Sequence, residues 1–261
     1  MALRDEIKAG RKDLMENGTL KQKIAYFFDY YTLHTVVIAA VLIFAISFIY
    51  QQVTKPDIVL NGIVLNVLSF DEGDPIEDMR SGFLEYINVD TKKNDMSLNT
   101  TLMLNMGAAS QQGQVSDYEA SQAMMVQCAA GAVDFVSSPF KAIQNYGYGE
   151  LFVNLEDVLS EEELEKYAPY FLYVDLAIVD KKNEAIDNDQ NADKVPMPDP
   201  TKPEEMEKPI PVFIDVTSCE KMKNIYSYSP DTLAIAVAVN APNPDRISDF
   251  LTYLFEYYFR K

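Results

Sequence analysis

The longest apolar segment of the chain predicts a membrane-spanning helix near the N-terminus. Thr35–Tyr50 contains no charged side chain, and with its neighbours the apolar stretch extends over 33–53. About 20 such residues form a helix of about 30 Å, which matches the hydrocarbon core of a bilayer. A cleaved signal peptide fits less well, because its small-residue triplet Ala45-Ile46-Ser47 would lie inside the apolar run. We therefore expect a retained anchor.

The residues around this segment predict its orientation. Lys55 is the only basic residue close behind it, whereas six basic residues precede it: Arg4, Lys8, Arg11, Lys12, Lys21 and Lys23. The positive-inside rule places residues 1–32 in the cytoplasm as a tail, and 54–261 outside the cell membrane. The end of this tail carries aromatic residues typical of a membrane interface, which are Tyr26, Phe27, Phe28, Tyr30 and Tyr31 around Asp29.

Beyond the anchor, strand-like and helix-like patterns alternate. Ile58–Phe70 is apolar on both faces, as in a strand covered on both sides. Asp74 is a predicted helix N-cap, with Pro75 as first helical residue. A second strand is expected across 98–106 and a third across 133–136, the third ending at Ser137-Ser138-Pro139. These elements predict a mixed α/β domain.

The C-terminal part continues this alternation. Capping boxes at Ser116-x-x-Glu119 and Ser160-x-x-Glu163 predict two helix starts. Strands are expected over 210–216 and 233–239, and a helix is expected after Asn243. The acidic, proline-rich stretch 181–211 reads as an exposed loop or linker.

The charge distribution separates the two parts of the chain. Of 22 basic and 40 acidic residues, six and five respectively precede residue 54, so 54–261 carries a formal charge near −19. Such a field repels nucleic acid and favours cations or basic partners. Solubility is the simpler account of most of this charge.

Candidate catalytic and metal-binding groups are few. The only histidine, His34, lies at the membrane boundary, so a Ser-His-Asp system or a histidine zinc site is not expected. Ser138-x-x-Lys141 lacks the companion Lys-Thr-Gly element of β-lactam-recognising enzymes. The 187–193 segment has calcium-loop spacing but lacks the glycine and glutamate that such a loop requires. We predict no enzyme activity, no catalytic residue, no metal and no cofactor.

The two cysteines, Cys128 and Cys219, leave two alternatives open. An oxidising compartment permits a bridge between them, whereas a pair in a domain of this size is not a disulfide scaffold. Free, buried thiols are the favoured alternative.

Three segments of the domain carry a resemblance to a known family. Gln127–Pro139 has a small-residue helix end before an aspartate and a strand, Gly149–Tyr167 joins a leucine–aspartate turn to a helix, and Tyr228–Leu254 joins a strand to a final helix. In this order they resemble bacterial extracellular solute-binding proteins, although Val133 stands where that family often has proline. Phe28–His34 resembles a membrane-tethered subgroup of such lobes in Gram-positive bacteria.

The resemblance implies a periplasmic-binding-protein-like fold of type II. The main lobe would comprise 54–150 and 230–261, and a shrunken second lobe would comprise 151–229. In open α/β sheets ligands bind beyond the carboxyl ends of strands. The candidate ligand-binding residues there are Phe70, Asp71, Ser137, Ser138, Tyr228 and Ser229. The alternative account is that these residues cap helices and fill turns.

Two functions remain open at this point. The first is a membrane-anchored, extracytoplasmic solute-binding-like protein that presents a small molecule or peptide to a transporter. The second is a structural or regulatory module of the cell envelope that docks on another membrane protein, for which the loop 181–211 is the candidate contact.

Overall fold

The computed structural model describes residues 12, 16–68, 73–104, 117–188, 195–229 and 231–256. The chain divides into two compact units, Met1–Lys55 and Pro56–Lys261.

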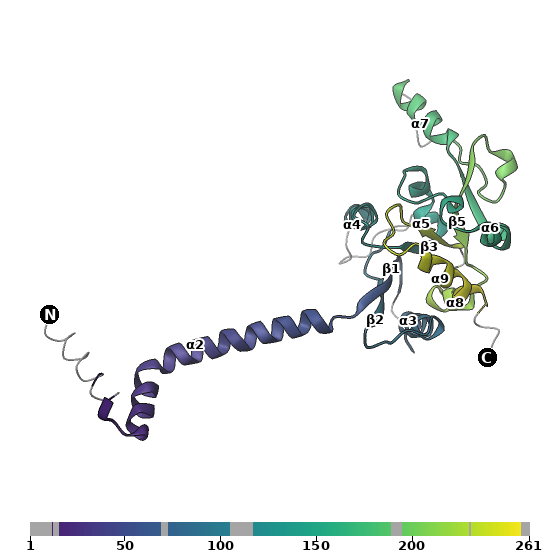
Figure 1. Ribbon diagram of the computed structural model, residues 1–261. Coiled ribbons are helices and arrows are strands. Elements are labelled where there is room, and N and C mark those ends of the chain that lie inside the picture. The colour runs from purple at the N-terminus through teal and green to yellow at the C-terminus, as the bar shows by residue number, and fades with distance from the viewer. Residues whose placement is uncertain are drawn as a thin grey trace. The chain divides into compact units, whose positions relative to one another are not determined.

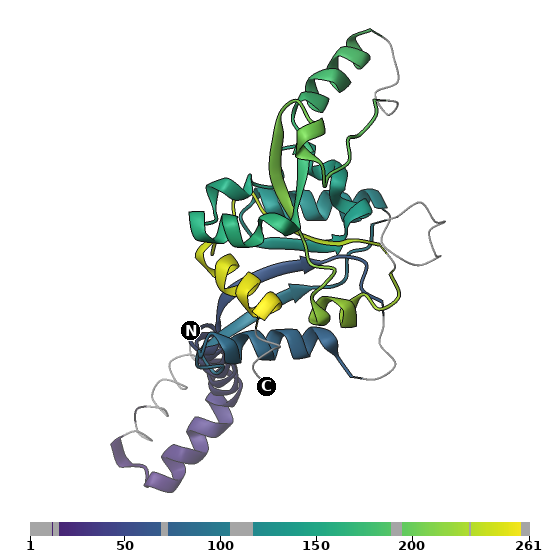
Figure 2. The same ribbon diagram turned by 90° about the vertical axis from the view of Figure 1, so that its right-hand side faces the viewer.

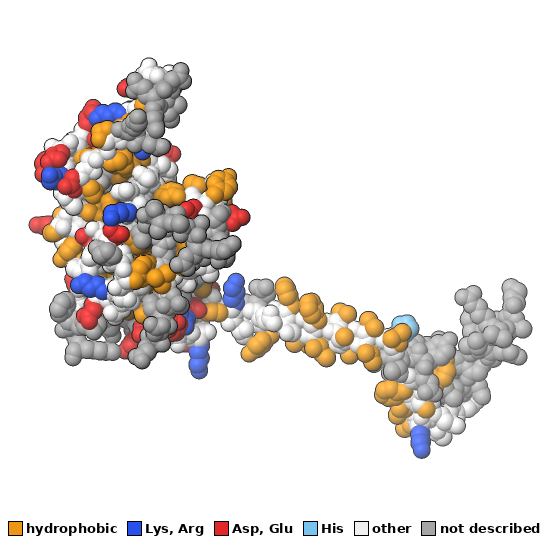
Figure 3. Space-filling model, turned by 180° about the vertical axis from the view of Figure 1, so that it is seen from behind, with side chains coloured by type: hydrophobic (Ala, Val, Ile, Leu, Met, Phe, Trp, Pro, Cys, Tyr) orange, Lys and Arg blue, Asp and Glu red, His pale blue; other side chains and the backbone are white. Residues whose placement is uncertain are grey.

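The first unit contains one long helix, α2 (Leu20–Thr54). It begins with a capping box in which the Thr19 hydroxyl accepts the backbone N–H of Gln22 and the Gln22 side chain accepts the Thr19 N–H. Within it, Leu33–Gln51 has a mean hydropathy of 2.4, and none of this stretch is buried. Hydrophobic side chains follow its length (Figure 3), and the helix bends near its N-terminal end (Figure 1). Among the described residues this is the one helix long and apolar enough to cross a membrane.

The second unit is built on a mixed six-stranded sheet in the order β2-β1-β3-β6-β5-β4. β1 pairs in parallel with β2 and β3, whereas the β3–β6, β6–β5 and β5–β4 pairs are antiparallel. The strands are β1 (Asp57–Val64), β2 (Asn94–Asn99), β3 (Phe135–Pro139), β4 (Phe171–Asp175), β5 (Pro209–Asp215) and β6 (Leu233–Val237). The predicted α/β class is therefore confirmed.

Helices cover both faces of the sheet (Figures 1 and 2). One face packs against α3 (Pro75–Tyr86), α6 (Glu161–Tyr167), α8 (Glu220–Ile225) and α9 (Asp245–Glu256). The other face packs against α4 (Asp117–Ala129) and the short α5 (Phe140–Ile143). Side chains of a strand alternate between these cores, so Phe135 of β3 lies in the first and Val136 in the second. The Phe135 ring stacks on Phe250 of α9, with ring centroids 4.8 Å apart.

Close packing inside the first core depends on Gly62 of β1. A Cβ atom at this position would lie 2.3 Å from the Phe135 ring, so only glycine leaves room for it. The helix α7 (Ala177–Asp187) projects from the sheet, with β4 and β5 at its base (Figure 2).

Several predicted helix starts are confirmed. Asp74 accepts the N–H groups of Ile76 and Glu77, and Pro75 is the first residue of α3. Ser160 and Glu163 form both arms of a capping box at the start of α6. Ser116, the cap predicted for α4, lies outside the described residues.

Three predicted strands differ from the structure. β1 ends at Val64 rather than Phe70, because Asn66 turns the chain with a φ of 58°. β2 lies at Asn94–Asn99 rather than 98–106, since the alternating Leu102 and Leu104 are buried beside Asn66 without forming a ladder.

The third strand extends further than predicted. β3 covers Phe135–Pro139, and each of its residues from Phe135↔Val237 to Pro139↔Leu233 is paired with β6. Ser137 and Ser138 are therefore inside the strand, not beyond its end.

The stretch 181–211 is shorter as a loop than predicted. α7 continues to Asp187, and β5 begins at Pro209. Charged side chains at 180–184 face solvent while Ala177, Ile178 and Ala185 are buried, so an amphipathic helix forms in an acidic sequence.

Both cysteines are free and buried, as favoured from the sequence. Cys128 belongs to the core on one face of the sheet and Cys219 to the core on the other. Burial raises the pKa of each thiol to about 12. The sheet between them explains why no bridge forms.

Candidate functional site

The carboxyl end of β1 lies beside the middle of β3, at a polar cluster centred on two tyrosines. The Leu65 N–H donates to the Ser137 carbonyl at 2.9 Å, which continues the parallel pairing past β1. The Tyr226 hydroxyl lies within reach of both the Leu65 carbonyl (2.9 Å) and the Ser137 carbonyl (3.1 Å). One hydroxyl thus connects the residue just after β1 with the middle of β3.

The second tyrosine, Tyr228, bonds the backbone of Asn66, the residue after Leu65. Its hydroxyl donates to the Asn66 carbonyl, and its ring lies 6.3 Å from that of Tyr226. Burial raises the pKa of both phenols, that of Tyr228 to about 12, so both remain protonated donors at neutral pH. We call Leu65, Asn66, Ser137, Tyr226 and Tyr228 the tyrosine lock.

Asn66 is the residue of this lock with an unused amide donor. Its N–H donates to the Leu102 carbonyl and its Oδ1 accepts the Leu104 N–H at 2.6 Å. Its Nδ2 is buried and has no hydrogen-bond partner in the described structure. A buried amide donor without a partner costs about 1–3 kcal/mol, and it is the type of group that a bound water or ligand satisfies.

The predicted site residues divide between this lock and other places. Ser137 and Tyr228 both belong to the lock, although Ser137 takes part through its carbonyl. Ser138 follows Ser137 in β3 and its side chain therefore points to the opposite face. Both serine side chains are at most 1% exposed, and neither hydroxyl has a partner in the described parts of the chain.

The remaining predicted residues have other positions. Ser229 closes the turn before β6, where its hydroxyl accepts the Asp231 N–H at 3.3 Å. Phe70 and Asp71 lie outside the described residues. Ser229 fits the alternative account, in which the residue fills a turn.

The Ser-x-x-Lys pattern does not bring its two side chains together. Lys141 Nζ forms an ion pair with Asp231 at 2.5 Å, while the Ser138 hydroxyl stays in the sheet. Among the described residues no group of three or more His, Cys, Asp or Glu side chains is placed to hold a metal ion.

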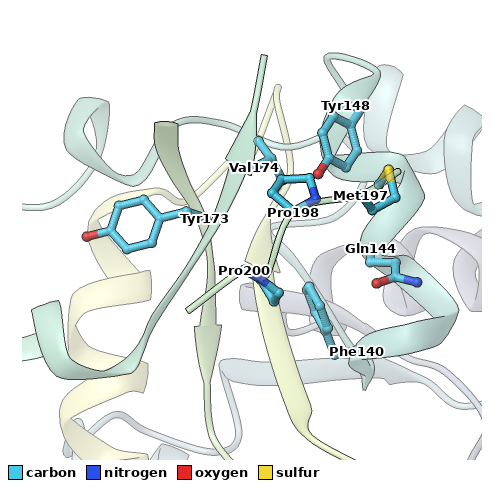
Figure 4. Close-up of a pocket in the computed structure, with 8 residues that line it drawn as sticks. All are labelled: Phe140, Gln144, Tyr148, Tyr173, Val174, Met197, Pro198 and Pro200. Atoms are coloured by element: carbon cyan, nitrogen blue, oxygen red, sulfur yellow. The ribbon is translucent and has the colours of Figure 1, made fainter. Parts of the chain in front are cut away.

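A hollow lies beside β4, the strand at one edge of the sheet. Residues 195–202, which we call the strap, run along this edge, and the Tyr173 N–H donates to the Pro200 carbonyl at 2.8 Å. Figure 4 shows Met197, Pro198 and Pro200 facing Phe140, Gln144 and Tyr148, while the Tyr173 ring points away from the rest. The Tyr148 hydroxyl and the Gln144 amide are the polar groups in otherwise apolar walls.

The size of this hollow limits what it can hold. About 220 Å³ of empty space, open solvent included, lies between its walls, and the centre of a water-sized molecule can occupy only about 10 Å³ of it. Pockets for small-molecule ligands usually measure about 300–1,000 Å³ and bury most of the ligand. The hollow under the strap therefore has room for about one water molecule and is not a closed ligand site.

Comparisons of the chain with protein-family models, curated proteins and solved structures found no match. The geometry alone thus has to support a function.

Three members of the lock, Leu65, Asn66 and Tyr226, were not predicted as site residues from the sequence. Asn66 interrupts an apolar run, and a polar residue in such a run was the available signal for the strand end. Tyr226 has no local signal, because its hydrogen bonds join segments 161 and 89 positions away.

Proposed function

We propose that this protein is a single-pass membrane protein whose α/β domain lies outside the cytoplasm and docks on another envelope protein without catalysing a reaction. The anchor would be 33–53, within α2, with the N-terminus in the cytoplasm. The apolar stretch Leu33–Gln51 and the basic residues ahead of it support this orientation.

One observation favours docking over small-molecule binding: the tyrosine hydroxyls at the carboxyl end of β1 are already hydrogen-bonded within the domain. In the described structure the hydroxyls of Tyr226 and Tyr228 are engaged with backbone carbonyls, and the hollow beside β4 is below ligand size. Groups that are already paired gain little by exchanging their partner for a ligand.

The surface we assign to docking is the projection formed by α7 and the strap. Exposed ion pairs hold its base together, Lys208 with Asp180 at 3.3 Å and Lys181 with Glu207 at 3.2 Å. The described part of this projection carries four acidic and three basic side chains, and the domain as a whole carries a formal charge near −19, so a partner with a basic surface fits it.

In this proposal the domain is a reduced relative of the solute-binding proteins. The expected small lobe, 151–229, contributes β4 and β5 to the same sheet as the main lobe and extends outward as α7. The reduced lobe would supply a contact surface in place of a closing cleft.

Site-specific photo-crosslinking in intact cells tests this surface. A photoreactive residue at Glu184, exposed on α7, should give a discrete crosslinked adduct. The matched control is Glu85, exposed on α3 at the other end of the domain, which should give none (Figure 1). Equal adducts at both positions, or none at Glu184, would contradict the docking surface.

Protease treatment of intact protoplasts tests the orientation separately. We expect digestion of 54–261 and survival of a small N-terminal fragment. Protection of the large domain until the membrane is permeabilised would place it in the cytoplasm and end the proposal.

A small-ligand receptor that serves a transporter is the second candidate. The unpaired Asn66 amide at the carboxyl edge of the sheet favours it, because ligands of open α/β sheets bind at this edge. A thermal-shift screen with sugars, amino acids, peptides and metal ions distinguishes the two functions. A shift that disappears in Asn66→Asp would favour the receptor over the docking module.

A further inference from the structure

The N-terminal part of α2 has a length that the membrane span does not explain. α2 starts at Leu20, 13 positions before the apolar stretch that begins at Leu33. The capping box at Thr19 fixes this start, since both of its hydrogen bonds are formed. A defined helical segment therefore precedes the anchor.

This segment is amphipathic. Leu20, Ile24 and Phe28 recur at intervals of four, which places them along one stripe of the helix. Their side chains are 81%, 55% and 58% exposed in the molecule. At 3.6 residues per turn, Lys21 and Lys23 fall on opposite sides of this stripe.

An apolar stripe flanked by lysines is the pattern of a helix lying in the plane of a membrane surface. The apolar side chains enter the boundary between headgroups and acyl chains, and the lysine stems extend sideways so that their ammonium groups reach lipid phosphates. The bend in α2 near its N-terminal end is compatible with a change of direction between such a segment and the span (Figure 1).

We propose that residues 20–28 form an in-plane helix that binds the lipid surface where the anchor enters the bilayer, with Leu20, Ile24 and Phe28 immersed and Lys21 and Lys23 on anionic headgroups. This inference rests on the proposed function, because it requires α2 to be a membrane anchor. Residues 20–28 are continuous with the membrane span in α2, so the anchor holds the apolar stripe within reach of the bilayer. Lipid is therefore the partner that we assign to the stripe.

The absence of tryptophan from the sequence makes a direct test possible. Three variants of the full chain, Ile24→Trp, Tyr26→Trp and Leu42→Trp, each carry one fluorescent reporter. Position 24 lies on the stripe, position 26 lies about 160° away around the helix, and position 42 lies inside the span. Each variant is reconstituted in vesicles of phosphatidylcholine and phosphatidylglycerol containing lipids brominated at shallow or deep acyl positions.

We expect shallow bromines to quench the Ile24→Trp reporter about threefold more than the Tyr26→Trp reporter, and deep bromines to quench the Leu42→Trp reporter most. Equal quenching at positions 24 and 26, whether strong or absent, overturns the in-plane helix. A blue-shifted but unquenched reporter at position 24 also overturns it, because protein rather than lipid would then cover the stripe. A lack of quenching at position 42 shows instead that the anchor, and with it the proposed function, is wrong.

The lysines are tested in the Ile24→Trp background. Lys21→Gln with Lys23→Gln should abolish the gain in quenching that phosphatidylglycerol gives over phosphatidylcholine alone. A gain that persists in this variant overturns the role of these lysines in headgroup binding.

Discussion

Each half of the sheet contains a buried aspartate, and the two are bonded differently. Asp134, at the start of β3 in the parallel half, accepts the N–H groups of Asn61 (2.7 Å) and Asn243 (2.6 Å), which lie 73 and 109 positions away. Asp175, at the end of β4 in the antiparallel half, accepts those of Ala177, Glu207 and Lys208, at most 33 positions away. Asp134 therefore connects parts of the domain that are distant in sequence, whereas Asp175 stabilises only the edge of the sheet at β4.

This difference indicates where the domain can change without unfolding. Breaking the Asp134 contacts separates β1, β3 and the segment before α9, so the whole domain is affected. Breaking the Asp175 contacts releases only the base of α7 and the residues just before β5. Regions held by short-range contacts open at lower free energy than the core, and surfaces that bind partners are often drawn from them.

The largest effect is expected from Asp134→Ala. The substitution removes a buried carboxylate that accepts two part-buried backbone N–H groups, so the free energy of unfolding should fall by about 3 kcal/mol. Thermal or urea unfolding of the full chain in detergent, followed by circular dichroism, measures it. Asp187→Ala, at an exposed position on α7, is the control and should change stability by less than about 0.5 kcal/mol. A loss of stability confined to the antiparallel half would contradict the role of Asp134 in connecting distant parts of the domain.

Tyr226→Phe should have the next largest effect. It removes a hydroxyl that reaches both the Leu65 and the Ser137 carbonyl, and the fully buried Leu65 carbonyl loses its donor, at a cost of about 1.5 kcal/mol. Tyr228→Phe is the matched control in the same turn. Because Tyr228 is 38% exposed, water can replace its hydroxyl and the cost should be about 0.5 kcal/mol. Equal losses of stability in the two variants would show that burial of the hydroxyl does not determine its contribution.

The edge of the sheet at β4 should lose stability in acid independently of the rest of the domain. Burial alone would raise the pKa of Asp175, but the backbone N–H donors of Lys208, Glu207 and Ala177 outweigh it, so the pKa is lowered. The stabilising contribution is therefore complete above the unfolded pKa of about 3.9 and is lost as pH falls through the lower folded pKa. Hydrogen exchange at Glu207 and Lys208, corrected for intrinsic rates, should show about 1 kcal/mol less protection below that pH.

Asp175→Asn separates this effect from general acid unfolding. The variant should already lose the protection of these two amides at neutral pH and show no further local change in acid. If wild-type protection falls equally in β1 and β3 over the same pH range, the edge is not an independent unit.

The sequence predicted those features that depend on neighbouring residues. Caps such as Asp74 and Ser160 were identified correctly because their partners lie within three positions. The extent of β3 was missed because Ser137 and Ser138 look like turn residues, and their strand conformation comes from pairing with β6 about 100 positions later. Contacts of that range leave no local signal.

The candidate site was partly predictable for the same reason. The rule that ligands bind beyond the carboxyl ends of strands drew attention to Ser137 and Tyr228, and both do contribute to the tyrosine lock. Asn66 and Tyr226 were missed, since only the folded sheet brings the residues after β1 beside those before β6.

The smallest effect is expected where the two halves meet at the surface. Lys141 follows β3 and Asp231 precedes β6, and their ion pair spans this junction at 2.5 Å. The lysine side chain is largely exposed, so solvent and salt screen the pair and its contribution should be no more than about 0.5 kcal/mol. A double-mutant cycle with Lys141→Met and Asp231→Asn, measured at low and high salt, isolates this coupling energy. We expect the coupling to vanish at high salt, because the backbone pairing of β3 with β6 already joins the two halves. A coupling above about 1.5 kcal/mol that persists in salt would show that this surface pair, and not only the strand ladder, holds the parallel and antiparallel halves together.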